Sequence, residues 1–128
     1  MRVLLDTHAF IWWDGASRRL SPRVKALCSD PANELFLSVA SLWEMQIKSL
    51  VGKLALRMPL PDLVEEQRRL NALTIVPVHA QHVFELDTLP RIHKDPFDRM
   101  LVAQARVEEL RLVSHDPVMR EYGVDIIW

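Results

Sequence analysis

Several features are scarce in this 128-residue sequence, namely cysteine, glycine, net charge and long hydrophobic runs. The lone Cys28 has no partner for an internal disulfide, which is typical of a reducing cytosol. No apolar run approaches the roughly 18 to 20 residues of a membrane span. The segment Met1–Asp6 meets a charge after three apolar residues, so it contains no signal-peptide core. We therefore expect a cytoplasmic protein without a membrane-spanning segment.

The near absence of net charge limits the possible partners. Sixteen basic and seventeen acidic residues give a formal charge of −1, which argues against strong non-specific attachment to nucleic acid or an anionic membrane. A local basic rim around an acidic site is still compatible with this balance. The apolar fraction of 49% and the length suit one globular domain, residues 1–128, with a real core.

The chain alternates short β-type runs with longer helical patterns, which predicts βαβ units and a parallel sheet of the α/β class. A proline at position 77 places its strand at an edge of the sheet. We expect strands near residues 3–5, 35–38, 74–78, 112–115 and 125–128. Helices are expected near residues 9–13, 22–29, 39–50, 63–70, 80–86 and 96–109. The helix from residue 39 carries an apolar stripe made of Val39, Trp43, Ile47 and Leu50.

Four acidic residues lie where these strands meet helices: Asp6, Glu44, Asp98 and Asp116. The carboxyl ends of the strands in an open α/β sheet form one crevice, where ligands bind. Carboxylates gathered there repel one another unless a cation lies between them. The sequence therefore predicts a divalent metal site, and its oxygen ligands favour Mg²⁺ or Mn²⁺ over zinc. Phosphodiester hydrolysis is the chemistry that such an ion supports.

Each acid also has an ordinary structural interpretation when it is taken alone. Asp6 is suited to cap the helix that follows, while Asp95 and Asp116 each precede a proline, as helix N-caps often do. Glu44 has Lys48 four residues later, the favourable order for a helical ion pair. Glu44 is nevertheless neither at a helix end nor on the apolar stripe, so capping does not explain it. The metal site accounts for the whole set better.

Other enzyme classes lack their motifs in this chain. It has no glycine-rich phosphate loop, no Walker lysine and no GxSxG elbow, so nucleotide triphosphate use and serine hydrolysis are unsupported. His8, His93 and His115 lie near proposed ligands but match no fixed ligand spacing. The sequence leaves open whether they move protons, bind metal or do neither.

Several segments resemble the PIN-domain ribonucleases, and most of all the VapC-type toxins of bacterial toxin–antitoxin pairs. They are Leu4–His8, Ser41–Met45 with Lys48 and Gly52–Leu54, His93–Ala105, and Leu112–Asp116. The resemblance implies a three-layer fold with a five-stranded parallel sheet between helices, and metal-dependent cleavage of RNA that leaves a 5′-phosphate and a 3′-hydroxyl. It also implies a cognate antitoxin and a homodimer.

The resemblance assigns roles residue by residue. Asp6, Glu44 and Asp98 would be the main carboxylates and Asp116 the fourth, with the Thr7 hydroxyl supporting the site. Asp95 departs from a simple assignment because it is a second aspartate three residues before Asp98, and we treat it as the helix cap.

Two basic residues beside the acids, Lys48 and Arg99, are candidate contacts to RNA phosphates. Solvated surface charge is the alternative for both. Two other classes of protein also stay open at this point. A receiver-type signalling domain has a similar length and an acidic Mg²⁺ pocket, and a PIN-like module could bind a partner without catalysis.

Overall fold

The computed structural model describes residues 1–128 and contains one sheet of five parallel strands. The strands are β1 (Arg2–Leu5), β2 (Glu34–Ser38), β3 (Thr74–Val76), β4 (Arg111–Val113) and β5 (Ile126–Ile127). Their order is β3-β2-β1-β4-β5, so the strand before Pro77 is an edge strand as predicted. Receiver domains have the order 2-1-3-4-5. The receiver alternative is therefore wrong, and the predicted α/β class with a five-stranded parallel sheet is confirmed.

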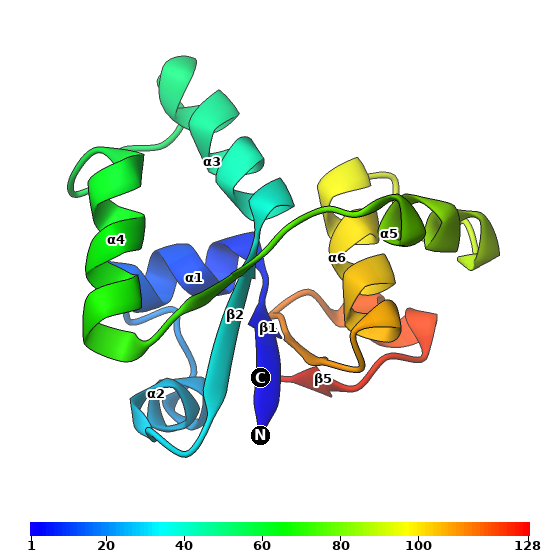
Figure 1. Cartoon of the computed structure of the whole chain (residues 1–128), viewed down its shortest axis with the longest axis horizontal. Coiled ribbons are helices and arrows are strands. Elements are labelled where there is room, and N and C mark those ends of the chain that lie inside the picture. Colours follow the sequence, from blue (N-terminus) through cyan, green and yellow to red (C-terminus); the bar gives the residue numbers. More distant parts are fainter.

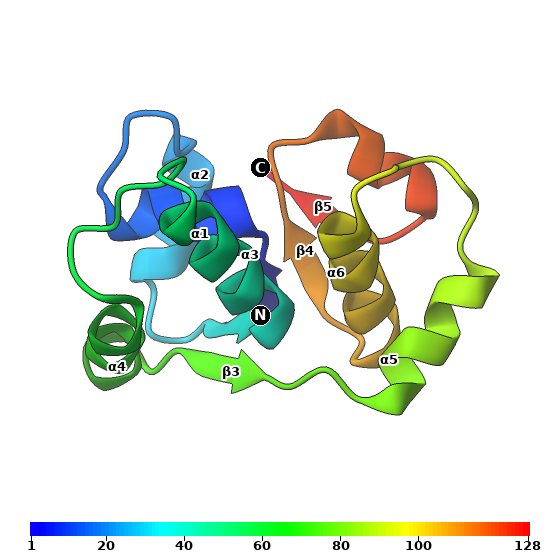
Figure 2. The same cartoon turned by 90° about the horizontal axis from the view of Figure 1, so that it is seen from above.

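Helices cover both faces of the sheet. They are α1 (Thr7–Asp14), α2 (Pro22–Ser29), α3 (Val39–Leu50), α4 (Leu60–Asn71), α5 (Ala80–Glu85) and α6 (Pro96–Val107), with 3₁₀ turns η1 (Leu86–Thr88) and η2 (Pro117–Tyr122). Helices α1 to α4 lie on one side of the sheet, and α5, α6 and η2 lie on the other (Figures 1 and 2). The three-layer arrangement is thus present. None of the helices is long and apolar enough to cross a membrane.

The central strand β1 is buried on both faces and divides the core in two. Val3 and Leu5 point into the layer that contains Phe10, while Leu4 points into the layer that contains Leu101. Val3, Leu4 and Leu5 have no exposed surface. This alternation follows from the two-residue period of a strand. Because β1 is buried on both faces, its carboxyl end lies in the middle of the molecule, and so does Asp6, which follows it.

Side-chain caps set the starts of most helices. Asp6, Ser21, Ser38 and Asp95 each accept a hydrogen bond from a backbone N–H in the first turn of α1, α2, α3 and α6 respectively, and Asp116 does the same for η2. The predicted capping roles of the Asp-Pro pairs are therefore confirmed. Helix α4 begins three residues earlier than expected, because its Pro61 lies inside the first turn.

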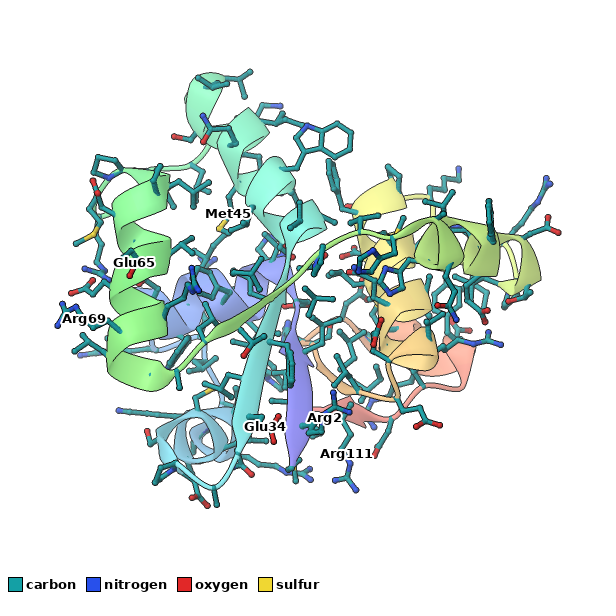
Figure 3. The ribbon with its side chains drawn as sticks, viewed as in Figure 1. Arg2, Glu34, Met45, Glu65, Arg69 and Arg111 are labelled. Carbon is teal, nitrogen blue, oxygen red and sulfur yellow. The ribbon has the colours of Figure 1, made fainter.

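The apolar stripe of α3 does not face the core. Trp43 is 64% exposed and Leu50 is 76% exposed, whereas Ala40, Glu44 and Met45 are buried. Helix α3 extends beyond the carboxyl end of β2, and Met45 points from it toward the layer of α1 and α4 (Figures 1 and 3). Helical spacing identifies a stripe but not what covers it, so the buried face of α3 carries a carboxylate and the outer face carries the tryptophan.

The opposite end of the sheet carries mixed charge. Arg2, Glu34 and Arg111 project from the amino ends of β1, β2 and β4 (Figure 3). Arg2 lies 3.7 Å from Glu34, and Arg111 lies 3.0 Å from Asp125. In each of these exposed pairs, the positive charge of the arginine is matched by a carboxylate beside it. The predicted acids Asp6 and Asp116 follow the carboxyl ends of β1 and β4, at the other end of the sheet.

Candidate metal centre

Asp6 follows β1 directly and is 5% exposed. Its Oδ1 accepts a hydrogen bond of 2.7 Å from the backbone N–H of Ala9. Burial raises the pKa of Asp6, the charge of Glu44 raises it further, and hydrogen bonds from Ser114 and Ala9 oppose the shift. The carboxylate is thus anchored through one oxygen and kept in a place that disfavours its charge.

Glu44 lies on the buried face of α3 and is 4% exposed. Its Oε2 accepts a 2.7 Å hydrogen bond from the Lys48 ammonium, which confirms the expected pair, although one partner is buried. Its Oε1 is buried with no hydrogen-bond partner. Beside it, the Thr7 hydroxyl donates to the Ser41 hydroxyl at 3.0 Å and joins α1 to α3. A buried carboxylate oxygen without a partner is costly, and a cation is the partner that would satisfy it.

Asp98 lies in the first turn of α6, three residues after the cap Asp95. Burial raises the pKa of Asp98 to about 7, and the neighbouring charges of Asp95, Asp6 and Glu44 add to the effect. Only His93 opposes the shift among the charged groups around it. A buried carboxyl group with a raised pKa and other carboxyl groups around it is a candidate for binding a cation.

His93 joins Asp98 to Asp116. Its Nε2 lies 3.2 Å from Asp98 Oδ2 and 2.9 Å from Asp116 Oδ2. These three residues offer ligand atoms within 4.8 Å of one another, close enough to surround a metal ion. They come from three separate places, namely the loop before α6, the first turn of α6 and the turn after β4.

A cavity of about 430 Å³ opens at this end of the sheet. Its wall brings together three of the four predicted acids with all three of the histidines whose role the sequence left open. The lining residues are Asp6, His8, Trp12, His93, Asp98, His115, Asp116 and Pro117. Glu44 is not on this wall but lies behind it, and its charge acts on both Asp6 and Asp98.

Trp12 was not expected at the site. Its ring lies 5.7 Å from the His8 ring and 5.8 Å from the His115 ring, measured between centroids, and 5.7 Å from Trp128. One wall of the cavity is therefore aromatic and the other is acidic. The pair Trp12–Trp13 carried the only hint in the sequence, because two adjacent helical residues cannot both face the same side.

The two basic candidates have partners within the chain. Lys48 is bound to Glu44, as described above. The Arg99 guanidinium donates to the carbonyl oxygen of Pro90 at 2.8 Å and to that of Leu86 at 3.3 Å. Contact of either residue with RNA phosphates stays a prediction.

Comparison with known proteins identifies the family. The family model described as PIN domain matches residues 3–125. The chain belongs to the PIN domain family. Among curated proteins, no match was found.

Solved structures share this PIN fold at low sequence identity. VapBC2 from Rickettsia felis, bound to a DNA fragment from its promoter, has a TM-score of 0.72 and 16% identity, covering 99% of this chain and 98% of the other. FitAcB from Neisseria gonorrhoeae has a TM-score of 0.69 and 15% identity, covering 98% and 96%. VapBC-1 from nontypeable Haemophilus influenzae has a TM-score of 0.65 and 16% identity, covering 99% and 97%. The PIN-like fold predicted from the sequence is therefore confirmed.

The residues of this PIN domain fit a hard divalent cation. The donors are carboxylate oxygens, which Mg²⁺ and Mn²⁺ prefer. The unpartnered Glu44 Oε1 and the pKa of about 7 at Asp98 are both features that a bound cation would remove.

Proposed function

We propose that this PIN domain is a Mg²⁺- or Mn²⁺-dependent endoribonuclease that acts as the toxin of a type II toxin–antitoxin pair in the cytoplasm. The observation that carries the proposal is the gathering of carboxylates at the carboxyl ends of the strands, two of them buried, in and beside a cavity of about 430 Å³. The family membership and the likeness in fold to VapBC and FitAB complexes support the toxin role.

Three acids would hold the ion in this proposal, namely Asp6, Glu44 and Asp98, with Asp116 at the edge of the site. A bound divalent ion lowers the pKa of water and neutralises charge on the phosphate oxygens. The Ala9 N–H holds the orientation of Asp6, whose side chain lines the cavity. The Thr7–Ser41 hydrogen bond fixes α1 against α3, and thereby the distance between Asp6 and Glu44.

The aromatic wall gives the substrate class further support. Bases of single-stranded RNA stack on aromatic side chains, each stack being worth about 1–3 kcal/mol. Trp12 lines the same cavity as Asp98, beside His8 and His115. We assign to Trp12 a stacking contact with the base next to the scissile phosphate. Lys48 and Arg99 remain the proposed phosphate contacts at the rim.

An apolar groove between α3 and α6 suits self-association of two copies. The groove has a volume of about 410 Å³ and joins the exposed stripe of α3; it is lined by Val39, Ala40, Trp43, Val78, Leu86, Pro96, Phe97 and Met100. The Trp43 and Phe97 rings meet edge to face with centroids 5.3 Å apart. Exposed apolar surface of this kind marks interaction sites. We assign this face to the homodimer, and the other proposed protein partner is a small antitoxin.

The test is cleavage of RNA by the purified protein with the RNA ends mapped. We expect cleavage with Mn²⁺ or Mg²⁺ and none with EDTA, and products with a 5′-phosphate and a 3′-hydroxyl. Asp6→Asn should lower the rate at least a hundredfold while the protein stays folded. Metal-dependent cleavage that survives in Asp6→Asn would refute the assignment. A folded protein that binds Mn²⁺ yet cuts no RNA would favour the alternative of a PIN-like binding module without catalysis.

A further inference from the structure

His93 lies where a second cation would lie in an acidic site. The Nε2 atom is 2.9 Å from one Asp116 oxygen and 3.2 Å from one Asp98 oxygen, so a single ring atom contacts both carboxylates. In a two-metal site, an ion between two such carboxylates holds them together. Here a side chain of the chain itself stands in that position.

The other ring nitrogen of His93 shows which role Nε2 plays. The backbone N–H of Asp95 donates to His93 Nδ1 at 3.1 Å. A backbone N–H can only donate, so Nδ1 carries the lone pair, and the proton of the neutral ring is on Nε2. The Nε2–H group therefore faces the two aspartates as a donor. In this orientation it offers no lone pair to a metal.

The loop that carries His93 is held in place from both sides. The backbone N–H of His93 donates to the Tyr122 hydroxyl at 2.7 Å, and Asp95 caps α6 through the N–H of Phe97 at 2.9 Å. Tyr122 is buried. To turn Nε2 into a metal ligand, the Asp95 N–H contact would have to break and the ring proton would have to move. The hydrogen bonds around His93 thus support a donor and oppose a ligand.

We propose that His93 replaces the second metal ion of this centre, so that the site binds one divalent ion and the His93 N–H holds Asp116 in its place. The inference rests on the proposed metal site of the nuclease but concerns the number of ions, independently of what is cut. It also makes Asp116 a residue bound to His93 in the native site, with the ion held among Asp6, Glu44 and Asp98.

The experiment counts bound Mn²⁺ per chain on the whole protein without RNA, by electron paramagnetic resonance and by titration calorimetry. We expect one ion in the wild type. His93→Ala removes the donor and opens the space between Asp98 and Asp116, so we expect two ions with the spectrum of a spin-coupled Mn²⁺ pair. His93→Gln keeps an amide donor at similar reach and should stay at one ion. His79→Ala, an exposed histidine at the start of α5, is the matched control and should also stay at one.

Three results would overturn the inference. They are two ions in the wild type, one ion in His93→Ala, and a directly bonded nitrogen in the electron spin echo spectrum of the wild-type Mn²⁺ complex. The first and third need no variant, so they hold even if His93→Ala does not fold. Loss of RNA cleavage is a separate matter, since a protein with one bound Mn²⁺ and no nuclease activity would sink the proposed function and leave the role of His93 intact.

Discussion

Replacing Asp98 by asparagine should make the metal-free protein more stable, although the residue is part of the proposed site. The pKa of Asp98 is raised from 3.8 to about 7 in the folded protein, so the folded state binds more protons than the unfolded state between about pH 4 and pH 7. Stability without metal should therefore fall as pH rises through this range and stay low above pH 7. An asparagine side chain carries no charge, so Asp98→Asn should lose this pH dependence.

The size of the effect follows from the shift. About three pKa units at roughly 1.4 kcal/mol each set an upper bound of about 4 kcal/mol at pH 8. The side chain is 22% exposed and the substitution weakens a contact with His93, which together reduce the gain. We expect Asp98→Asn to be about 2 kcal/mol more stable than the wild type at pH 8 in EDTA, or roughly 6 to 10 °C in Tm.

Bound metal should make the wild type more stable than Asp98→Asn. An ion at a hundred times its Kd stabilises the wild type by about 2.7 kcal/mol, and Asp98→Asn should gain much less because it lacks a ligand. Urea unfolding followed by tryptophan fluorescence at pH 5 and pH 8, with EDTA or Mn²⁺, measures the stability of each protein under all four conditions. Asp62→Asn in the first turn of α4 is the matched control, since Asp62 is exposed and this variant should keep the stability and the pH dependence of the wild type. An Asp98→Asn variant less stable than the wild type at pH 8 in EDTA would refute the idea that burial and the neighbouring carboxylates disfavour the charge of Asp98.

Four further outcomes are expected. Asp95→Ala should cost about 1 kcal/mol of stability through loss of the α6 cap while Mn²⁺ affinity by calorimetry changes less than tenfold; a complete loss of Mn²⁺ binding would make Asp95 a ligand. Trp43→Glu should convert the proposed homodimer to a folded monomer, as measured by light scattering, and a variant that remains dimeric would place the interface elsewhere. Trp12→Ala should raise KM for a short RNA about tenfold or more through lost stacking, and an effect on kcat alone would contradict this role. The Cys28 thiol, buried with its pKa raised to about 12, should react with a disulfide reagent at pH 8 only when the protein unfolds.

The strands and most helix starts could be predicted because they depend on local chemistry. The unbroken apolar run Val3–Leu5 indicated a strand covered on both faces, and Asp95-Pro96 marked the start of α6. The α3 stripe shows where this reasoning stops. Its spacing is helical, but the helix extends past the sheet (Figure 1), and Trp43 and Leu50 of the stripe are exposed.

The gathering of Asp6, Asp98 and Asp116 at one end of the sheet and the Glu44–Lys48 pair could be predicted, whereas the contacts of His93 could not. Strand ends in a parallel sheet meet at one edge, so Asp6 and Asp116 had to approach each other once the sheet formed. His93 lies in the irregular loop before α6, and its contact with Asp116 joins residues that are 23 positions apart in the sequence. No spacing rule describes such a contact. The burial of Glu44 likewise depends on how α3 packs. The apolar stripe along α3 would have predicted the opposite face of the helix to be buried.

The partners of the four acids point to where a single ion would bind. Glu44 has the Lys48 ammonium at 2.7 Å. His93 Nε2 lies 2.9 Å from Asp116 and 3.2 Å from Asp98, so it is closer to Asp116. Asp6 and Asp98 are the acids whose pKa is raised, chiefly by burial and in part by neighbouring carboxylates. Burial and the neighbouring carboxylates therefore disfavour the charge of both Asp6 and Asp98. A cation bound beside these two acids would offset that effect.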